Sequence, residues 1–101
     1  MDRRLDLQSL LVSILGSPNV YFQPPENLKL QYPCIIYTRD KIEQRYADDR
    51  TYSHKVRYSL TLITRSPDSD LVMKILELPY CSYDRCYAAD SLNHDTFTLY
   101  Y

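Results

Sequence analysis

The residues from His54 to Thr64 alternate between two chemical types, and this alternation constrains the fold more than any other feature of the chain. One set is mainly apolar: His54, Val56, Tyr58, Leu60, Leu62 and Thr64. The residues between them are polar or charged: Lys55, Arg57, Ser59 and Thr61. Because successive side chains of a β-strand point to opposite faces, this pattern predicts a strand with one buried face.

A second strand-like segment runs from Cys34 to Tyr46, and the tight polar turn Asp48–Arg50 separates the two. Together they predict a long hairpin from Cys34 to Arg65, whose far half consists almost entirely of charged residues and tyrosines. A projecting hairpin of this composition favours contact with other proteins over chemistry.

The N-terminal segment has the spacing of an amphipathic helix. Its apolar residues recur at intervals of three and four: Leu7, Leu10, Leu11, Ile14 and Leu15. We expect a helix from about Arg3 to Leu15, with Asp2 as its cap. Gly16, the one glycine of the chain, stands where a left-handed residue ends a helix, and Pro18 prevents continuation.

A second helix is predicted after the hairpin. Ser66 is the expected N-cap and Pro67 lies in the first turn, followed by Asp68 and Asp70 near the positive end of the helix dipole. The inward face is apolar until Pro79: Leu71, Val72, Ile75, Leu76 and Leu78.

Short extended segments complete the pattern. Val20–Phe22 lies among prolines at positions 24, 25 and 33, which favours an edge strand or a stiff arm. Near the C-terminus, Cys81–Ala89 and Asp95–Tyr101 predict two antiparallel strands joined by a loop at Asp90–His94. The last strand carries no charge from Phe97 onward, so we expect it to be central in the sheet or covered by another subunit.

The order of helix, strands, helix and strands predicts a single α+β domain over residues 1–101, with two helices on one face of an antiparallel or mixed sheet. A chain of this length buries roughly 65% of the surface that it exposes when unfolded. With 45% hydrophobic and 25% charged residues, its composition is that of an ordinary globular domain.

Composition also limits the functions that the chain can have. A single glycine excludes the glycine-rich loops that cradle phosphates. The net charge of −1 gives no global attraction to nucleic acid or to an acidic membrane. Three cysteines cannot pair completely, and the apolar stretch Leu5–Leu15 is shorter than a membrane span, so we expect a protein made in a reducing cytoplasm without contact to a membrane.

No constellation matches a chemical site well. Cys81, Cys86 and His94 have an incomplete spacing for zinc, and the cysteines are better interpreted as small buried hydrophobic residues. Asp90, His94 and Asp95 could form an acid–base group, but no nucleophile or pocket accompanies them, and polar side chains at a turn usually bond to the backbone. We therefore expect neither an enzyme nor a bound metal or cofactor.

Basic residues next to tyrosines, as at Tyr37–Arg39, Arg45–Tyr46 and Arg57–Tyr58, could stack on single-stranded bases. Four acidic residues in the same hairpin oppose this interpretation: Asp40, Glu43, Asp48 and Asp49. A protein interface or a solvated sheet surface is the preferred alternative.

Six segments along the chain resemble a family of short proteins encoded among the head–tail genes of long-tailed bacteriophages, the tail-completion or tail-terminator proteins. They are Asn19–Glu26 (NVYFQPPE), Tyr32–Tyr37 (YPCIIY), Asp48–Tyr52 (DDRTY), Pro67–Asp70 (PDSD), Leu78–Arg85 (LPYCSYDR) and Tyr87–Tyr100 (YAADSLNHDTFTLY). None of these segments is a catalytic signature. The resemblance implies helices packed on a mixed sheet with an extended hairpin.

The resemblance also implies a non-enzymatic virion protein that forms a hexameric ring on the head-proximal end of the tail tube. Such a ring stops polymerisation of the major tail protein and presents a surface to the head–tail connector, while DNA only passes through its lumen. On this basis we expect subunit or tube contacts between Arg39 and Arg57, where mixed charge can set register. The candidate residues are Arg39, Arg45, Tyr46, Arg50, Tyr52 and Arg57.

Three other functions stay open at this point. A head-side stopper or adaptor protein of the neck is the nearest alternative, because such proteins are of similar size. A small single-stranded nucleic-acid-binding module would show salt-dependent retention of an oligonucleotide. A small enzyme would carry a bound metal or cofactor after purification.

Overall fold

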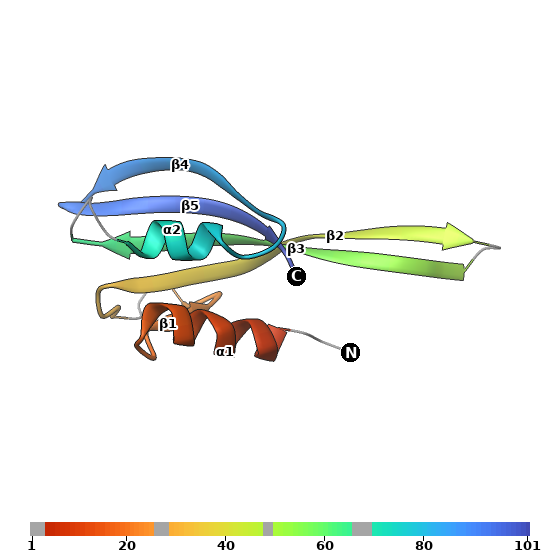
Figure 1. Ribbon diagram of the computed structural model, residues 1–101, viewed down its shortest axis with the longest axis horizontal. Helices are drawn as coiled ribbons and strands as arrows, with labels where there is room; N and C mark the ends of the chain where they lie inside the picture. Colours follow the sequence, from red (N-terminus) through yellow and green to blue (C-terminus); the bar gives the residue numbers. More distant parts are fainter. Residues whose placement is uncertain (1–3, 26–28, 48–49, 66–69) are drawn as a thin grey trace.

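A computed structural model describes residues 4–25, 29–47, 50–65 and 70–101, and the side chains of residues 43–54 lie outside this description. The elements, in chain order, are α1 (Arg4–Leu15), β1 (Val20–Phe22), β2 (Cys34–Ala47), β3 (Arg50–Thr64), α2 (Leu71–Leu76), β4 (Cys81–Ala89) and β5 (Leu92–Tyr100) (Figure 1). Two helices and a mixed five-stranded sheet confirm the expected α+β class.

The strands lie in the order β1-β2-β3-β5-β4. The short β1 pairs with β2 in parallel, and all other neighbours are antiparallel. The C-terminal strand β5 lies between β3 and β4, which shows that it is central in the sheet. One edge of the sheet is therefore formed by β4, a strand that carries charge, and the other by β1.

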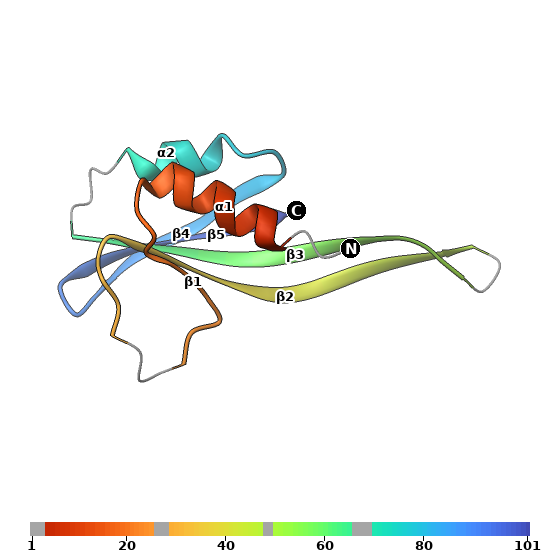
Figure 2. The same ribbon diagram turned by 90° about the horizontal axis from the view of Figure 1, so that it is seen from below.

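Both helices lie on the same side of the sheet (Figure 2). Leu7 and Leu11 of α1 and Ile75 of α2 are fully buried against the apolar side chains of the sheet. The core consists of Leu7, Leu11, Val20, Ile35, Tyr37, Tyr58, Leu60, Leu62, Ile75, Phe97 and Leu99. Burial of Tyr58, Leu60 and Leu62 confirms the apolar face predicted from the alternation in β3.

The first helix ends as its sequence predicts. Gly16 has φ +74° and its N–H donates to the carbonyl of Val12 at 2.9 Å, the geometry of a left-handed residue that closes a helix. Its predicted start at Asp2 and Arg3 lies outside the described residues.

The edge position of β1 is also confirmed. Its three residues pair with Ile35–Tyr37, and Gln23 then leaves the strand with φ +46°. The backbone N–H of Gln23 donates to Tyr37, while its side-chain Oε1 accepts the N–H of Arg39 at 3.3 Å. Gln23 thus covers the outer edge of β2 beyond the end of β1, as far as Arg39.

The second helix begins later than the sequence predicts. It starts at Leu71 with Asp70 at the N-cap position, and no side-chain bond caps it. The expected cap Ser66 and the expected first-turn residue Pro67 lie outside the described residues. The helix ends at Leu76, so the predicted inward-facing Leu78 follows the helix and does not belong to it.

The connection between the last two strands is shorter than predicted. Instead of a five-residue loop at Asp90–His94, a two-residue turn joins β4 to β5, with φ +52° at Asp90 and +64° at Ser91. Two consecutive positive φ angles mark the hairpin turn whose twist matches that of the flanking strands. Asn93 and His94 are therefore strand residues, which corrects their assignment to a loop.

The sheet has a compact part and a projecting part. β3 pairs with β5 only from Arg57 onward, so the rest of β2 and β3 pair with each other alone. This two-stranded ribbon extends well beyond the other elements (Figure 1), and the molecule measures 52 × 27 × 23 Å. The register of β2 shifts between Arg39 and Lys41, which places a β-bulge at Asp40 where the ribbon begins.

Two leucines of α1 test how the helix packs. Leu11 is fully buried and Leu5 is 64% exposed. We expect Leu11→Ala to lower the free energy of unfolding by about 2–5 kcal/mol, because it removes packed methyl groups from the core. The matched control Leu5→Ala should change it by less than about 0.5 kcal/mol. Urea unfolding of both variants measures the difference, and equal effects would contradict the packing of α1 on the sheet.

Candidate functional site

Two of the predicted interface residues lie at the root of the ribbon, on opposite faces of the sheet. Arg39 pairs across the strands with Tyr58, whose side chain is in the core under the helices. Arg57 pairs with Lys41 and with Tyr100, and its side chain lies on the face that the helices leave uncovered. Because they lie on opposite faces, Arg39 and Arg57 do not form one flat contact surface.

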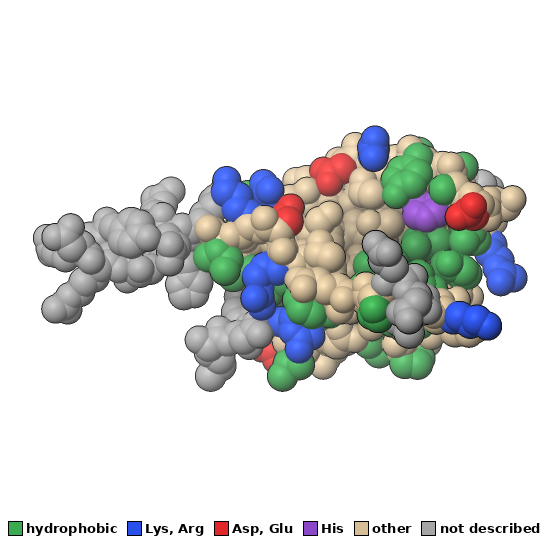
Figure 3. Space-filling model, turned by 180° about the vertical axis from the view of Figure 1, so that it is seen from behind, with side chains coloured by type: hydrophobic (Ala, Val, Ile, Leu, Met, Phe, Trp, Pro, Cys, Tyr) green, Lys and Arg blue, Asp and Glu red, His purple; other side chains and the backbone are tan. Residues whose placement is uncertain are grey.

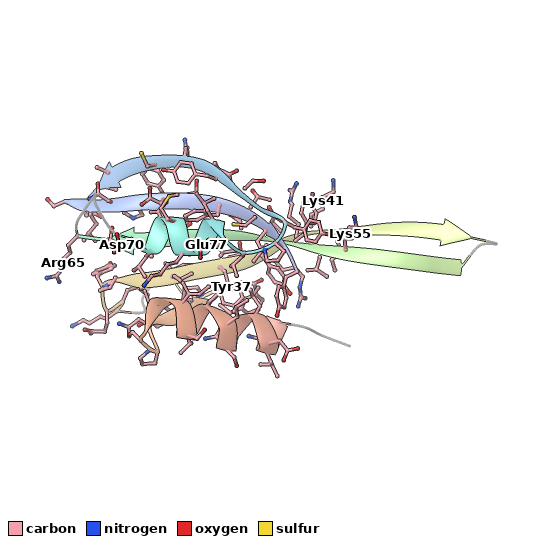
Figure 4. The ribbon with its side chains drawn as sticks, in the orientation of Figure 1. Tyr37, Lys41, Lys55, Arg65, Asp70 and Glu77 are labelled. Carbon is pink, nitrogen blue, oxygen red and sulfur yellow. The ribbon has the colours of Figure 1, made fainter. Side chains whose placement is uncertain are left out.

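On the uncovered face, Arg57 holds the bulge in place. Its Nε donates to Oδ1 of Asp40 at 2.9 Å, and each side chain is about one-third exposed, at 32% and 34%. The hydrogen bond to Asp40 is the main cause that raises the pKa of the Arg57 guanidinium, with a second bond to Tyr100. Lys41 and Lys55 lie beside this pair where β2 and β3 leave the body (Figure 4).

On the covered face, the root of the ribbon is tied to α1 and β1. The guanidinium carbons of Arg4 and Arg39 lie 4.6 Å and 6.0 Å from the centre of the Phe22 ring. Phe22 in turn packs against Tyr37, whose hydroxyl donates to Gln8 Oε1 at 2.5 Å. Arg39 thus has a structural role on this face, although its side chain is exposed.

The other four predicted interface residues lie further along the ribbon: Arg45, Tyr46, Arg50 and Tyr52. Their backbones belong to β2 and β3, with a second register shift between Arg45 and Tyr46 that leaves Tyr52 without a partner in the ladder. Their side chains lie outside the described part of the chain, so their role as contact residues stays a prediction.

The uncovered face carries rows of hydroxyl groups. One row crosses four strands through Thr38, Ser59, Thr98 and Ser82, and the next contains Thr61 and Thr96. Figure 3 shows this face, with few charged side chains across its middle and basic side chains gathered near the ribbon. The middle of this face is therefore suited to water or to a polar partner, whereas the same face buries Cys34 and Ile63 at the end away from the ribbon.

The edge strand β4 is the feature that sequence reasoning missed. Its side chains from Ser82 to Ala88 are all exposed, on both faces of the sheet. A bulge occurs at Asp84, whose Oδ2 accepts the hydroxyl of Thr98 at 2.9 Å, and the adjacent Arg85 lies 5.1 Å from the ring of Tyr87. The one available signal was the Asp-Arg pair at the middle of a strand, which is typical of an exposed edge.

Asp90, His94 and Asp95, which were considered as an acid–base group and set aside, do not come together in the structure. Asp95 is nearly buried on the covered face, where its Oδ1 accepts the hydroxyl of Tyr83 at 2.8 Å. This hydrogen bond is the main cause that raises the pKa of Tyr83, followed by one to Cys86. His94 points to the opposite face and stacks on Tyr87 with ring centres 4.8 Å apart, while Asp90 is exposed in the turn.

The three cysteines lie in different environments. Cys34 is buried as predicted, Cys81 is partly buried, and Cys86 is exposed, so the prediction of a buried residue is wrong for Cys86. Burial raises the pKa of the Cys34 thiol to about 11, and burial together with Asp84 raises that of Cys81. Within the described residues, no three His, Cys, Asp or Glu side chains come close enough to hold a metal ion.

The chain matches no known protein-family model, and a search of curated proteins finds no significant match. Among the described residues, no helix has the length and apolar character needed to cross a membrane.

The cysteines allow a test of burial by reactivity. At about pH 8 we expect a chromogenic disulfide reagent to modify the exposed Cys86 rapidly. The buried Cys34 should react only after unfolding, because the reactive form is the thiolate and burial disfavours it. The thiol of Cys34 ionises less readily in the folded chain than in the unfolded chain. Its contribution to the free energy of unfolding is therefore fully present below the pKa of the unfolded chain, and it is lost as the pH rises through about 11. Cys86→Ser is the control and should abolish the rapid phase; rapid labelling of folded Cys34 would contradict its burial.

Proposed function

We propose that this chain is a tail-completion, or tail-terminator, protein of a long-tailed bacteriophage. In this role it is a structural protein of the virion, assembled in the host cytoplasm, that forms a hexameric ring on the head-proximal end of the tail tube. The ring ends polymerisation of the major tail protein and provides the surface that joins the tail to the head–tail connector.

The observation that carries this proposal is the ribbon formed by the far halves of β2 and β3. Beyond Arg57 these strands pair only with each other, and no other described element packs along them. A two-stranded hairpin alone is marginally stable in water. A partner that covers the ribbon gives a physical reason for its length, and assembly into a ring supplies that partner in the neighbouring subunit.

The resemblance along the sequence and the α+β architecture support the same function. The segments that carry the resemblance extend from Asn19 to Tyr100, and the mixed sheet with two helices agrees with the fold that the resemblance implies. The uncharged middle of the uncovered sheet face is compatible with a channel wall that DNA can pass without being held.

The mechanism requires two different surfaces on one ring. One surface binds the last ring of the tube, and the other denies a docking site to the next ring of major tail protein. Head-to-tail contacts between identical subunits close such a ring, because each subunit uses two different patches. The mixed charge of the ribbon supports recognition of one register and rejection of others.

Electron microscopy of lysates from a phage that lacks this gene tests the proposal. We expect overlong or irregular tubes beside DNA-filled heads, because nothing would stop polymerisation at the correct length. Complementation with the intact gene is the control and should restore virions. Tails of normal length that stay unattached would assign the protein to the head-side connector, and normal infectious virions would overturn the structural role.

Charge reversal on the ribbon tests the contact residues. Simultaneous replacement of Arg45, Arg50 and Arg57 by Glu should reduce the yield of virions strongly, because like charges then face the partner. Reversal of three exposed basic residues away from the ribbon is the matched control: Lys29, Arg65 and Lys74. Circular dichroism verifies that both proteins fold, and an unchanged virion yield from the ribbon variant would show that these arginines make no essential contact.

A further inference from the structure

The outer edge of β4 has no partner strand in the described part of the chain, because β4 is the last strand of the sheet. Its side chains from Ser82 to Ala88 are exposed on both faces. An unpaired edge presents backbone N–H and C=O groups to which a further strand can bind. The sheet can therefore be extended at β4.

The bonds between β4 and β5 show which residues of β4 direct their backbone groups outward. The N–H of Tyr100 donates to the carbonyl of Tyr80 at 3.2 Å, so every second residue from Tyr80 onward bonds to β5. Beyond the bulge at Asp84, the two-residue turn after β4 makes Ala89 a bonded position, and the alternation runs back from there. The residues between these positions point outward: Cys81, Tyr83, Cys86 and Ala88.

These four residues are spaced symmetrically about the bulge and all lie on the covered face of the sheet. In an antiparallel contact, the outward residues of one strand bond to outward residues of the other. A second copy of β4 meets this condition for all four residues in a single register, which pairs Tyr83 with Cys86 and Cys81 with Ala88. The bulge of one strand then faces the bulge of the other, so the interruption falls at the same level in both strands.

The charges are complementary in this register. Asp84 of each copy faces Arg85 of the other, so two pairs of opposite charge meet at the two-fold axis. Both side chains are exposed on the uncovered face, where Asp84 accepts the hydroxyl of Thr98 and Arg85 lies against the ring of Tyr87. A shift of one residue in either direction would bring two aspartates or two arginines together, which is unfavourable.

On the covered face, the same register shields an exposed apolar strip. Tyr83 is 41% exposed, although its ring packs edge-on against Phe97 at 5.4 Å and its hydroxyl donates to Asp95 at 2.8 Å. These two contacts hold the ring in place, so little side-chain freedom is lost when its outer side is covered. In the second copy, the exposed Cys86 lies directly opposite this ring.

We propose that the free chain forms a two-fold dimer in which β4 pairs antiparallel with β4 of a second copy, through Tyr83–Cys86, Cys81–Ala88 and Asp84–Arg85. The two sheets then form one continuous sheet, with the helices of both copies on the same side. Backbone hydrogen bonds and the apolar strip supply most of the attraction, and the charge pairs select the register.

This contact goes beyond the proposed ring and does not rest on it. Both copies use the same patch in the dimer, whereas a ring needs two different patches on each subunit. Because β5 separates β4 from β3, the ribbon stays accessible in the dimer.

A disulfide tests the register with one exposed substitution. Ala88→Cys places a thiol opposite the natural Cys81 of the second copy, with Cα atoms about 5.5 Å apart, a distance that a disulfide can span. We expect mild oxidation to give a covalent dimer, in which mass spectrometry of peptides identifies a bond between positions 88 and 81. Adding Cys81→Ser should abolish this bond. Ser82→Cys is the matched control and should form no such dimer, because position 82 faces Tyr87. Failure of Ala88→Cys to form the bond, with a native circular dichroism spectrum, would overturn the proposal.

Sedimentation of the unmodified chain and of charge variants provides the second measurement. We expect an equilibrium between monomer and dimer, and labelling of Cys86 should slow as the dimer forms; a monomer at every concentration up to about 1 mM would overturn the contact. Asp84→Arg alone and Arg85→Asp alone should each weaken the dimer by about tenfold or more, because like charges then meet at the axis. Both changes in one chain should restore it.

Asp6→Arg and Lys29→Asp are the matched controls for the charge variants, because both residues are exposed and lie outside β4. Neither should change the dimer by more than about twofold. If the variant with both changes in β4 folds but does not recover the dimer, the proposed register is wrong.

Discussion

β3 pairs with its two neighbouring strands over different lengths, and this difference determines the shape of the molecule. On one side β3 pairs with β2 along nearly its whole length, but on the other side β5 accompanies it only from Arg57 to Thr64. Where three strands run together, their apolar residues meet the helices and form the core. Where β5 ends, β2 and β3 continue as a ribbon without a core. β2 and β3 thus run through both the compact body and the ribbon, so the ribbon is connected directly to the centre of the sheet.

The bulge at Asp40 lies at the boundary between these parts. A bulge increases local twist and can redirect a strand, and here the side chain of Asp40 accepts the guanidinium of Arg57 on the neighbouring strand. On the opposite face, Phe22 lies beneath Arg39 and Arg4 and connects the same point to α1. The direction of the ribbon is therefore fixed from both faces of the sheet at its root, whereas further out the backbones of β2 and β3 pair with each other alone.

Local sequence signals predicted much of the fold but not the arrangement of its edges. The helical spacing of α1, the closing glycine and the alternation around Tyr58 are determined by neighbours along the chain, and the structure confirms them. The order of the strands depends on contacts between distant segments, so sequence alone left open whether β5 was central or covered by a subunit. The turn at Asp90 and Ser91 was missed because neither is the glycine that usually marks two positive φ angles.

Prediction of the candidate site from the sequence was limited in the same way. Charge in the hairpin pointed to an interface, but a bulge inserts one residue into a strand, so Lys41 lies on the same face as Asp40 and Arg57. In a segment where both faces carry polar residues, no alternation reveals that insertion. For the same reason the sequence did not distinguish β4 as an edge: Tyr83, Asp84 and Arg85 do not separate into an apolar and a polar set.

Bulges and charges on edge strands usually prevent proteins from joining through their sheets, and both devices occur here on β2 and β4. A bulge interrupts the ladder, so a flat, regular strand cannot continue across it without losing hydrogen bonds. Charges on the same residues add a cost for any register that places like charges together. The bulges at Asp40 and Asp84 therefore protect β2 and β4 against indiscriminate pairing with other strands.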